Sequence, residues 1–250
     1  MTTSTPPVQL PQHGSEGQVW SALLDVADAQ PTGWTLVGAL MVMLHAYETG
    51  IATARATRDI DAMVRVRGVA HATRKFTETL EDLGWELHPG HPTSDGVAFR
   101  YVKGDVLFDA LAPDGLGQRA DLTTFGSART VQIPGGSRAL ARSRNVRVML
   151  GDRTSEVPCP DLIGALTIKS RAAATDQGST SDPHHRAERH VEDLAILYTC
   201  ADNLTDLADT MSHSEGRALR DAPTPHWDAL DPQYIAQAQA AHRYLTRGGA

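Results

Sequence analysis

The sequence has few cysteines and lacks the patterns of a secretory signal or a membrane span. Its two cysteines, Cys159 and Cys200, are too few for a disulfide framework, and neither lies in a CxxC-type metal spacing. The first fourteen residues lack a basic start followed by an apolar run, so we expect no secretory signal. The longest apolar run, Leu36 to Leu44, is about half of what a membrane span needs. We therefore expect a cytoplasmic protein with no membrane partner.

Lysine and several catalytic motifs are also scarce or missing. Only three lysines occur, at positions 75, 103 and 169, so arginine carries most of the positive charge. The sequence has no GxxxxGK[ST] loop, no GxSxG elbow and no HExxH helix, which argues against P-loop NTPases, α/β-hydrolases and zincins. The net charge of −7 argues against a general nucleic-acid coat protein.

What remains is an ordinary globular composition with a change of character along the chain. Of the 250 residues, 41% are hydrophobic and 21% are charged, which is typical of one or two folded domains. We predict a disordered tail over 1–14, a mixed α/β part over 15–158 and a helical part over 159–250. The predicted elements of the α/β part are helix 16–29, strand 34–37, helix 39–47, strand 58–66, helix 69–83, hairpin 97–111 and short strands near 129–133 and 145–150. The predicted helices of the helical part begin after an N-cap at Asp161 and then cover about 186–200, 203–221 and 231–246.

Three carboxylates form the sharpest chemical pattern. Residues i and i+2 of a strand project from the same face, so Asp59 and Asp61 are expected side by side, with Ile60 and Ala62 in the core. Asp109 lies inside an otherwise apolar strand, where a lone acid is costly to bury. Paired acids repel unless a cation bridges them, and Mg²⁺ prefers oxygen ligands. The set therefore suits a metal ion that neutralises a triphosphate.

An isolated D-x-D pattern is more often a solvated edge than a site, and two further features favour the site. Gly38 directly follows a short strand and opens a helix, where free N–H groups and a missing Cβ suit a phosphate. The order of parts is the second feature: strand, glycine, helix, acid-bearing strand, and then a later acid-bearing strand.

These residues resemble the DNA polymerase β-like nucleotidyltransferase superfamily, and more narrowly its AbiEii/AbiGii-type toxin branch. The matching segments are LVGALMVMLH from position 36, RATRDID from position 55 and VLFDALAP from position 106. The resemblance implies an α+β fold, with a mixed-sheet nucleotidyltransferase core over 15–158 and a helical C-terminal half that completes the active-site cleft.

The resemblance also assigns roles to residues. It implies Mg²⁺ on Asp59, Asp61 and Asp109, and it adds a lysine and an acid from later helices to the catalytic set, Lys169 and Asp193. The nucleotide-binding residues that it implies are Gly38, Ala39, Arg55, Thr57 and Lys169. Two positions depart from the family pattern: Ala39 replaces a second Gly or Ser, and His190 stands where the family often has an acid.

The implied activity is Mg²⁺-dependent transfer of a nucleoside monophosphate from an NTP to an acceptor hydroxyl. The branch implies a toxin of a toxin–antitoxin pair, with tRNA as acceptor and a cognate antitoxin as partner. An arginine-rich segment favours an RNA acceptor, because guanidinium groups match phosphate oxygens; it contains Arg129, Arg138, Arg142, Arg144 and Arg147. The alternatives are an antibiotic-modifying nucleotidyltransferase, which the overall acidity favours, and a catalytically silent nucleotide-binding protein.

Overall fold

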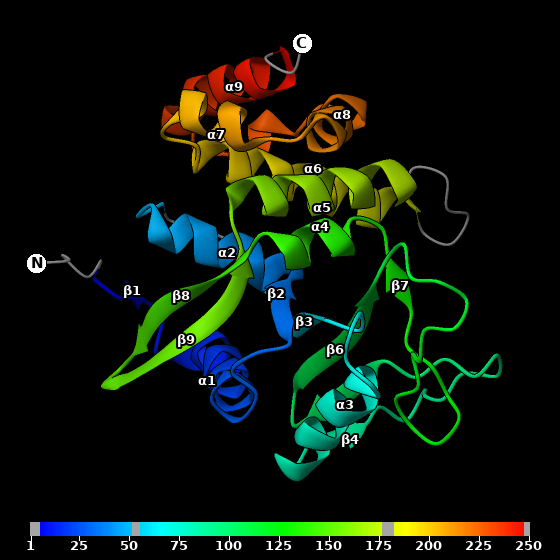
Figure 1. Cartoon of the computed structure of the whole chain (residues 1–250). Helices are drawn as coiled ribbons and strands as arrows, with labels where there is room; N and C mark the ends of the chain where they lie inside the picture. The colour runs from blue at the N-terminus through cyan, green and yellow to red at the C-terminus, as the bar shows by residue number, and fades with distance from the viewer. Residues whose placement is uncertain (1–5, 52–55, 177–182, 248–250) are drawn as a thin grey trace, which may run out of the picture.

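Two sheets form the lower part of the molecule in Figure 1, and helices cover them. The computed structural model describes residues 6–51, 56–176 and 183–247. The strands are β1 (Val8–Gln9), β2 (Trp34–Val37), β3 (Asp59–Val64), β4 (Glu86–Leu87), β5 (Arg100–Lys103), β6 (Val106–Pro113), β7 (Gln132–Ile133), β8 (Ser143–Leu150) and β9 (Arg153–Pro160). The larger sheet has the order β2-β3-β6-β5-β4, with β7 paired to β6, and the smaller sheet has the order β1-β8-β9.

The helices separate into a set around the sheets and a set above them. They are α1 (Gly14–Ala29), α2 (Gly38–Glu48), α3 (Ala72–Asp82), α4 (Gly136–Ala141), α5 (Leu162–Asp176), α6 (Pro183–Thr199), α7 (Leu204–Thr210), α8 (His213–Asp221) and α9 (Pro232–Arg247), with a short 3₁₀ helix at Trp227–Ala229. Helix α2 is buried continuously from Ala39 to Ala46, because it lies between the sheet and helices α5 and α6 (Figure 1). Among the described residues, no helix is long and apolar enough to cross a membrane.

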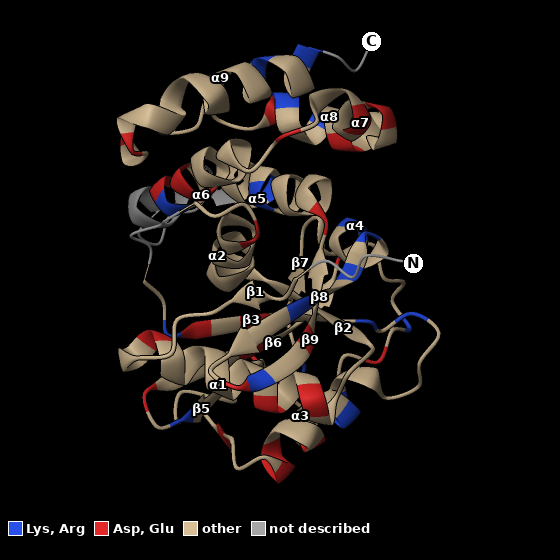
Figure 2. Ribbon diagram, turned by 90° about the vertical axis from the view of Figure 1, so that its left-hand side faces the viewer, with Lys and Arg blue, Asp and Glu red and all other residues tan. Residues whose placement is uncertain are grey.

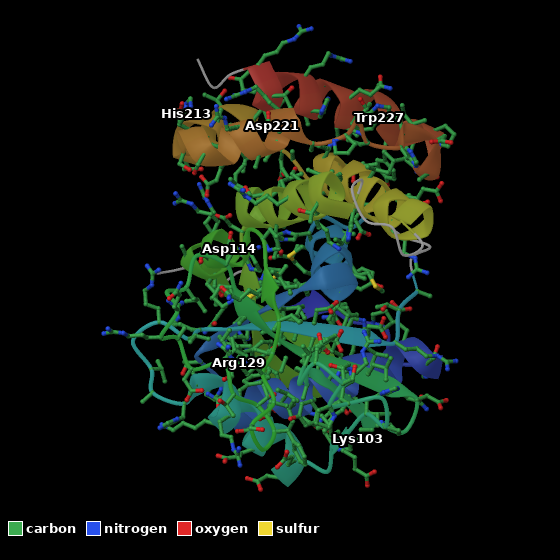
Figure 3. The ribbon with its side chains drawn as sticks, turned by 90° about the vertical axis from the view of Figure 1, so that its right-hand side faces the viewer. Lys103, Asp114, Arg129, His213, Asp221 and Trp227 are labelled. Carbon is green, nitrogen blue, oxygen red and sulfur yellow. The ribbon has the colours of Figure 1, made fainter. Side chains whose placement is uncertain are left out.

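The first half of β3 alternates between partly exposed and buried residues as the sequence predicts, whereas β6 is buried along almost its whole length. Strands β3 and β6 are parallel, and β2 pairs with β3 in antiparallel fashion. Ile60 and Ala62 of β3 are fully buried, while Asp59 and Asp61 point to the other face and keep partial exposure. In Figure 3, Lys103 marks the hairpin end of the sheet and Asp114 marks the end nearer the helices, so β6 runs toward the helical layer.

The predicted disordered tail is wrong for residues 8–14. Val8 and Gln9 pair in parallel with Val148 and Met149, and the side chain of Leu10 is buried. The backbone N–H groups on the outer edge of β8 would otherwise face water, and this short strand covers them. Residues 1–5 lie outside the described part.

The region after residue 130 also differs from prediction. The strands expected near 129–133 and 145–150 are present as β7 and β8, but the prediction lacked helix α4 between them and strand β9, which pairs with β8 in a long hairpin and continues to Pro160. Proline lacks an N–H donor, so the sequence around Pro158 and Pro160 does not indicate a strand. However, β9 is an edge strand, where these prolines do not remove a hydrogen bond of the sheet. The single helix predicted over 203–221 is two helices, because a capping box between Ser212 and Glu215 starts α8.

Candidate active site

Strand register brings two of the predicted acids together. In the parallel pairing of β3 and β6, Asp61 lies directly opposite Asp109, and Asp59 lies opposite Leu107. Asp109 is 6% exposed, whereas Asp59 and Asp61 are partly exposed. The pairing holds residues of adjacent strands close to each other, so the two carboxylates share one end of one face of the sheet.

The electrostatics of this cluster are unfavourable for charged acids. Burial raises the pKa of Asp61 to about 7, and the negative charges of Asp109 and Asp59 add to the rise, while Lys169 and Arg100 oppose it. Burial also raises the pKa of Asp109, although its hydrogen bonds with Arg100 act in the opposite direction. A carboxyl whose pKa is raised toward neutrality within a cluster of acids is typical of a site that can bind a cation.

Arg100 places positive charge beside the acids of the cluster. It lies opposite Asp109 in the β5–β6 hairpin, and its Nε and Nη2 atoms donate to Oδ1 and Oδ2 of Asp109 at 2.8 and 2.7 Å. Within the described ranges, no group of three or more His, Cys, Asp or Glu side chains is arranged to hold a metal ion. Asp59, Asp61 and Asp109 thus match a hard divalent cation in residue type and strand register, but the Asp109 carboxylate is turned to Arg100.

The glycine turn is pressed against the same acids. Val37 pairs with Asp61, and Gly38 follows with a φ of +72° at the start of α2. A Cβ atom at position 38 would overlap the Asp61 carboxylate, so only glycine fits there. The N–H groups of the first turn of α2 therefore begin beside the acids, and a helix N-terminus of this kind favours an anion. Ala39 is buried behind the turn.

The predicted lysine and the predicted helical acid contact each other. Lys169 of α5 donates to Oδ2 of Asp193 of α6 at 2.6 Å, and the two side chains are 6% and 0% exposed. The charge partner of the buried lysine is thus a residue of the chain itself, although its positive charge still reaches Asp61 and opposes the rise of that pKa. The helical half therefore contributes charge to the site on the sheet.

Thr57 and Arg55 are the remaining residues that were predicted to bind nucleotide. The Thr57 hydroxyl accepts the backbone N–H of Asp59 at 3.0 Å, so it closes a local turn at the start of β3. Arg55 lies outside the described residues. Arg100 is not among the residues predicted from the sequence, because its position opposite Asp109 depends on the register of the hairpin. The turn lies at Gly104-Asp105, which aligns Arg100 with Asp109.

The arginine-rich segment is not arranged as one basic strip. Arg142 contacts Asp161 and Glu215, each at 2.7 Å, and Arg144 forks onto Glu48 at 2.9 and 2.6 Å. Basic and acidic positions are interspersed over the helices and the sheets in Figure 2. Two of the arginines that favoured an RNA acceptor are therefore engaged in ion pairs within the chain.

Comparison with known proteins adds little to this geometry. No protein-family model matches the chain, and no curated protein sequence matches it significantly. A matching solved structure is the crystal structure of an antigenic nucleotidyltransferase-like protein from Paracoccidioides brasiliensis, with 14% identity over 85% of this chain and 95% of that chain. The TM-score of this match is 0.37.

Proposed function

We propose that the chain transfers a nucleoside monophosphate from an NTP to an acceptor hydroxyl. The acceptor hydroxyl gives up its proton to a carboxylate of the site or to water, and its oxygen attacks the α-phosphorus; the bond between the α-phosphorus and the α–β bridging oxygen breaks, and pyrophosphate leaves. One juxtaposition carries the proposal: the Gly38 turn at the start of α2 is pressed against Asp61, which lies opposite Asp109 on the next strand. Anion-binding N–H groups and cation-binding carboxylates thus lie side by side, which is what a metal–triphosphate complex requires.

Each residue has a role in this proposal. Asp59, Asp61 and Asp109 would hold Mg²⁺, which when bound neutralises phosphate charge and orients the reacting oxygens. The first turn of α2 would bind phosphate oxygens through backbone N–H groups, and the absence of a side chain at Gly38 permits that approach. Lys169, fixed by Asp193, would add positive charge from the helical layer.

Label transfer tests the proposal directly. The protein is incubated with each of the four α-³²P-labelled NTPs, Mg²⁺ and total RNA. We expect label in an acceptor and a loss of roughly 10²–10³-fold or more in Asp61→Asn, because the phosphate charge is then poorly compensated. Asp105→Asn is the matched control, because Asp105 is the same residue type on an exposed turn of the same sheet, with a side chain 82% exposed. Wild-type protein that labels neither RNA, protein nor itself would leave the silent nucleotide-binding alternative.

The resemblance to the AbiEii/AbiGii-type branch motivates a finer proposal, which is a cytoplasmic toxin that modifies tRNA and is neutralised by a cognate antitoxin. Expression alone should then arrest growth, and co-expression of the neighbouring gene product should restore it. Asp61→Asn should remove the arrest, whereas Asp105→Asn should keep it. Growth that is unaffected by the wild-type protein would count against the toxin role and leave the transfer reaction open.

A small cationic acceptor is the second candidate, and a specific observation favours it. Arg142 and Arg144 are paired with acids of the chain, and the net charge is −7, so the surface offers less attraction to RNA than to a cation. An aminoglycoside is an acceptor of this chemistry. Cells that express the wild-type protein should tolerate the drug better than cells that express Asp61→Asn.

A further inference from the structure

Arg100 is the part of the cluster that the proposed reaction does not yet use. Its guanidinium forks onto Asp109 through two hydrogen bonds, at 2.8 and 2.7 Å, directly beside Asp61 in the sheet. In this position it does for Asp109 what a divalent cation would do, because it sets positive charge against the carboxylate. Arg100 and a metal ion therefore compete for the same two oxygen atoms.

Exposure indicates which member of the pair can move. The Arg100 side chain is 33% exposed, whereas the Asp109 side chain is 8% exposed and lies on a central strand. Asp109 is therefore held in the sheet, whereas the Arg100 guanidinium borders solvent and can move. A guanidinium fork also fits phosphate oxygens as well as it fits a carboxylate, so a triphosphate would offer Arg100 an equivalent partner.

We propose that Arg100 is a partner-switching residue, which holds Asp109 in the ligand-free protein and moves to phosphate oxygens when a triphosphate and its divalent cation bind. This inference rests on the proposed function and adds a triphosphate-positioning role for a residue of β5.

Partner switching has a signature that a structural role lacks. Removal of the guanidinium frees Asp109 for a metal ion but removes a phosphate contact, so the two affinities should change in opposite directions. An arginine that only stabilises the sheet would weaken both affinities together, through loss of folded protein.

The experiment measures two probes separately on wild type, Arg100→Gln and Arg100→Lys. Mn²⁺ alone is titrated and detected by the EPR signal of the free ion, and inorganic triphosphate is titrated by calorimetry in excess Mg²⁺. For Arg100→Gln we expect Mn²⁺ to bind about 3–10-fold more tightly, which corresponds to the loss of one competing, partly exposed ion pair. Triphosphate should bind about tenfold more weakly, because a charge-assisted contact is lost.

The lysine variant guards against a folding failure of the glutamine variant. Arg100→Lys keeps the charge but lacks the fork, so both affinities should move in the same directions by smaller factors. Arg144→Gln is the matched control, since Arg144 forks onto Glu48 in the same way outside the cluster, and it should leave both affinities unchanged.

Failure of this inference is distinguishable from failure of the proposed function. If wild type binds Mn²⁺, Asp61→Asn does not, and neither Arg100 variant binds Mn²⁺ more tightly, partner switching is overturned and the proposed site stands. If neither wild type nor the Arg100 variants bind Mn²⁺, the metal-dependent function and the inference fall together. Far-UV circular dichroism on each variant confirms that the compared proteins are folded.

Discussion

Arg142 and Arg100 each hold a carboxylate through two donors, but the acids around them differ in how completely they are hydrogen-bonded. Arg142 joins the end of α4 to the start of α5 and to α8: it contacts Asp161 at 2.7 Å and both oxygens of Glu215 at 2.7 and 3.1 Å. Glu215 also accepts from Ser212, and the hydrogen bonds from Arg142 and Ser212 outweigh its burial and lower its pKa to about 2. Glu215 is therefore stabilised as an anion, and the cluster links the helical half to the sheets.

The cluster around Arg100 lacks this balance of acids and hydrogen-bond donors. Arg100 and Lys169 donate to Asp109 and Asp193, whereas within the described part of the chain Asp61 receives no hydrogen bond that would offset its burial. Burial, together with the negative charges of Asp109 and Asp59, raises the pKa of Asp61 to about 7. The comparison indicates that a balanced cluster stabilises the fold, whereas an unbalanced one is suited to bind a cation and its anionic ligand.

The largest effect is expected where the unbalanced cluster meets the glycine turn. In Gly38→Ala the new Cβ would overlap the Asp61 carboxylate, so either the turn or the acid must shift. A displacement of about 1 Å at a reacting centre can reduce a rate by roughly 10²-fold, and we expect at least this loss of label transfer. Gly50→Ala is the control, because Gly50 also has a positive φ, of +71°, but nothing lies within 4 Å of its added Cβ. Equal transfer by the two variants would contradict the placement of Gly38.

Substitution of Arg142 in the balanced cluster should lower the stability of the fold rather than the rate of label transfer. Arg142→Ala leaves the buried Glu215 without its cation, and we expect the free energy of unfolding to fall by about 2–4 kcal/mol. Urea unfolding followed by circular dichroism measures the change. Arg144→Gln removes a more exposed pair and should cost about 1 kcal/mol or less. A cost for Arg142→Ala as small as that for Arg144→Gln would remove the distinction between a clamp and a surface pair.

The smallest effect is a pH dependence with opposite signs in the two clusters. The folded-state pKa of Asp61 lies near 7, above its ordinary value of 3.8, so its contribution to stability falls as the pH rises from about 4 through 7. In chelator, Asp61→Asn should therefore be more stable than wild type at pH 8, by on the order of 1–2 kcal/mol given the partial exposure of the side chain, and the gap should close near pH 4.

Glu215→Gln provides the opposite pattern. The folded-state pKa of Glu215 is lowered from 4.5 to about 2, so its contribution is complete above pH 4.5 and disappears as the pH falls toward 2. The variant should be less stable than wild type at neutral pH and should approach it in acid. Thermal unfolding of both variants across this range measures the two slopes, and slopes of the same sign would refute the contrast between the clusters.

Much of the α/β part could be predicted from local pattern. The strand at 34–37, the strand at 59–64 and the helices on either side lie where the apolar pattern of the sequence predicts them. The prediction failed where partners far away in the chain determine the structure. Strand β1 forms because its backbone pairs with the otherwise open edge of β8. Strand β9 accommodates its prolines because it lies at a sheet edge.

Residue identity determined which groups this protein has available: three acids at strand positions, a glycine before a helix and one lysine on an apolar helix. Their partners depend on strand register and helix packing. The pairing of β5 with β6 brings Arg100 to Asp109, and the packing of α5 on α6 joins Lys169 to Asp193. Electrostatic energy depends on distances between groups that are remote in the chain, and only the tertiary structure sets those distances.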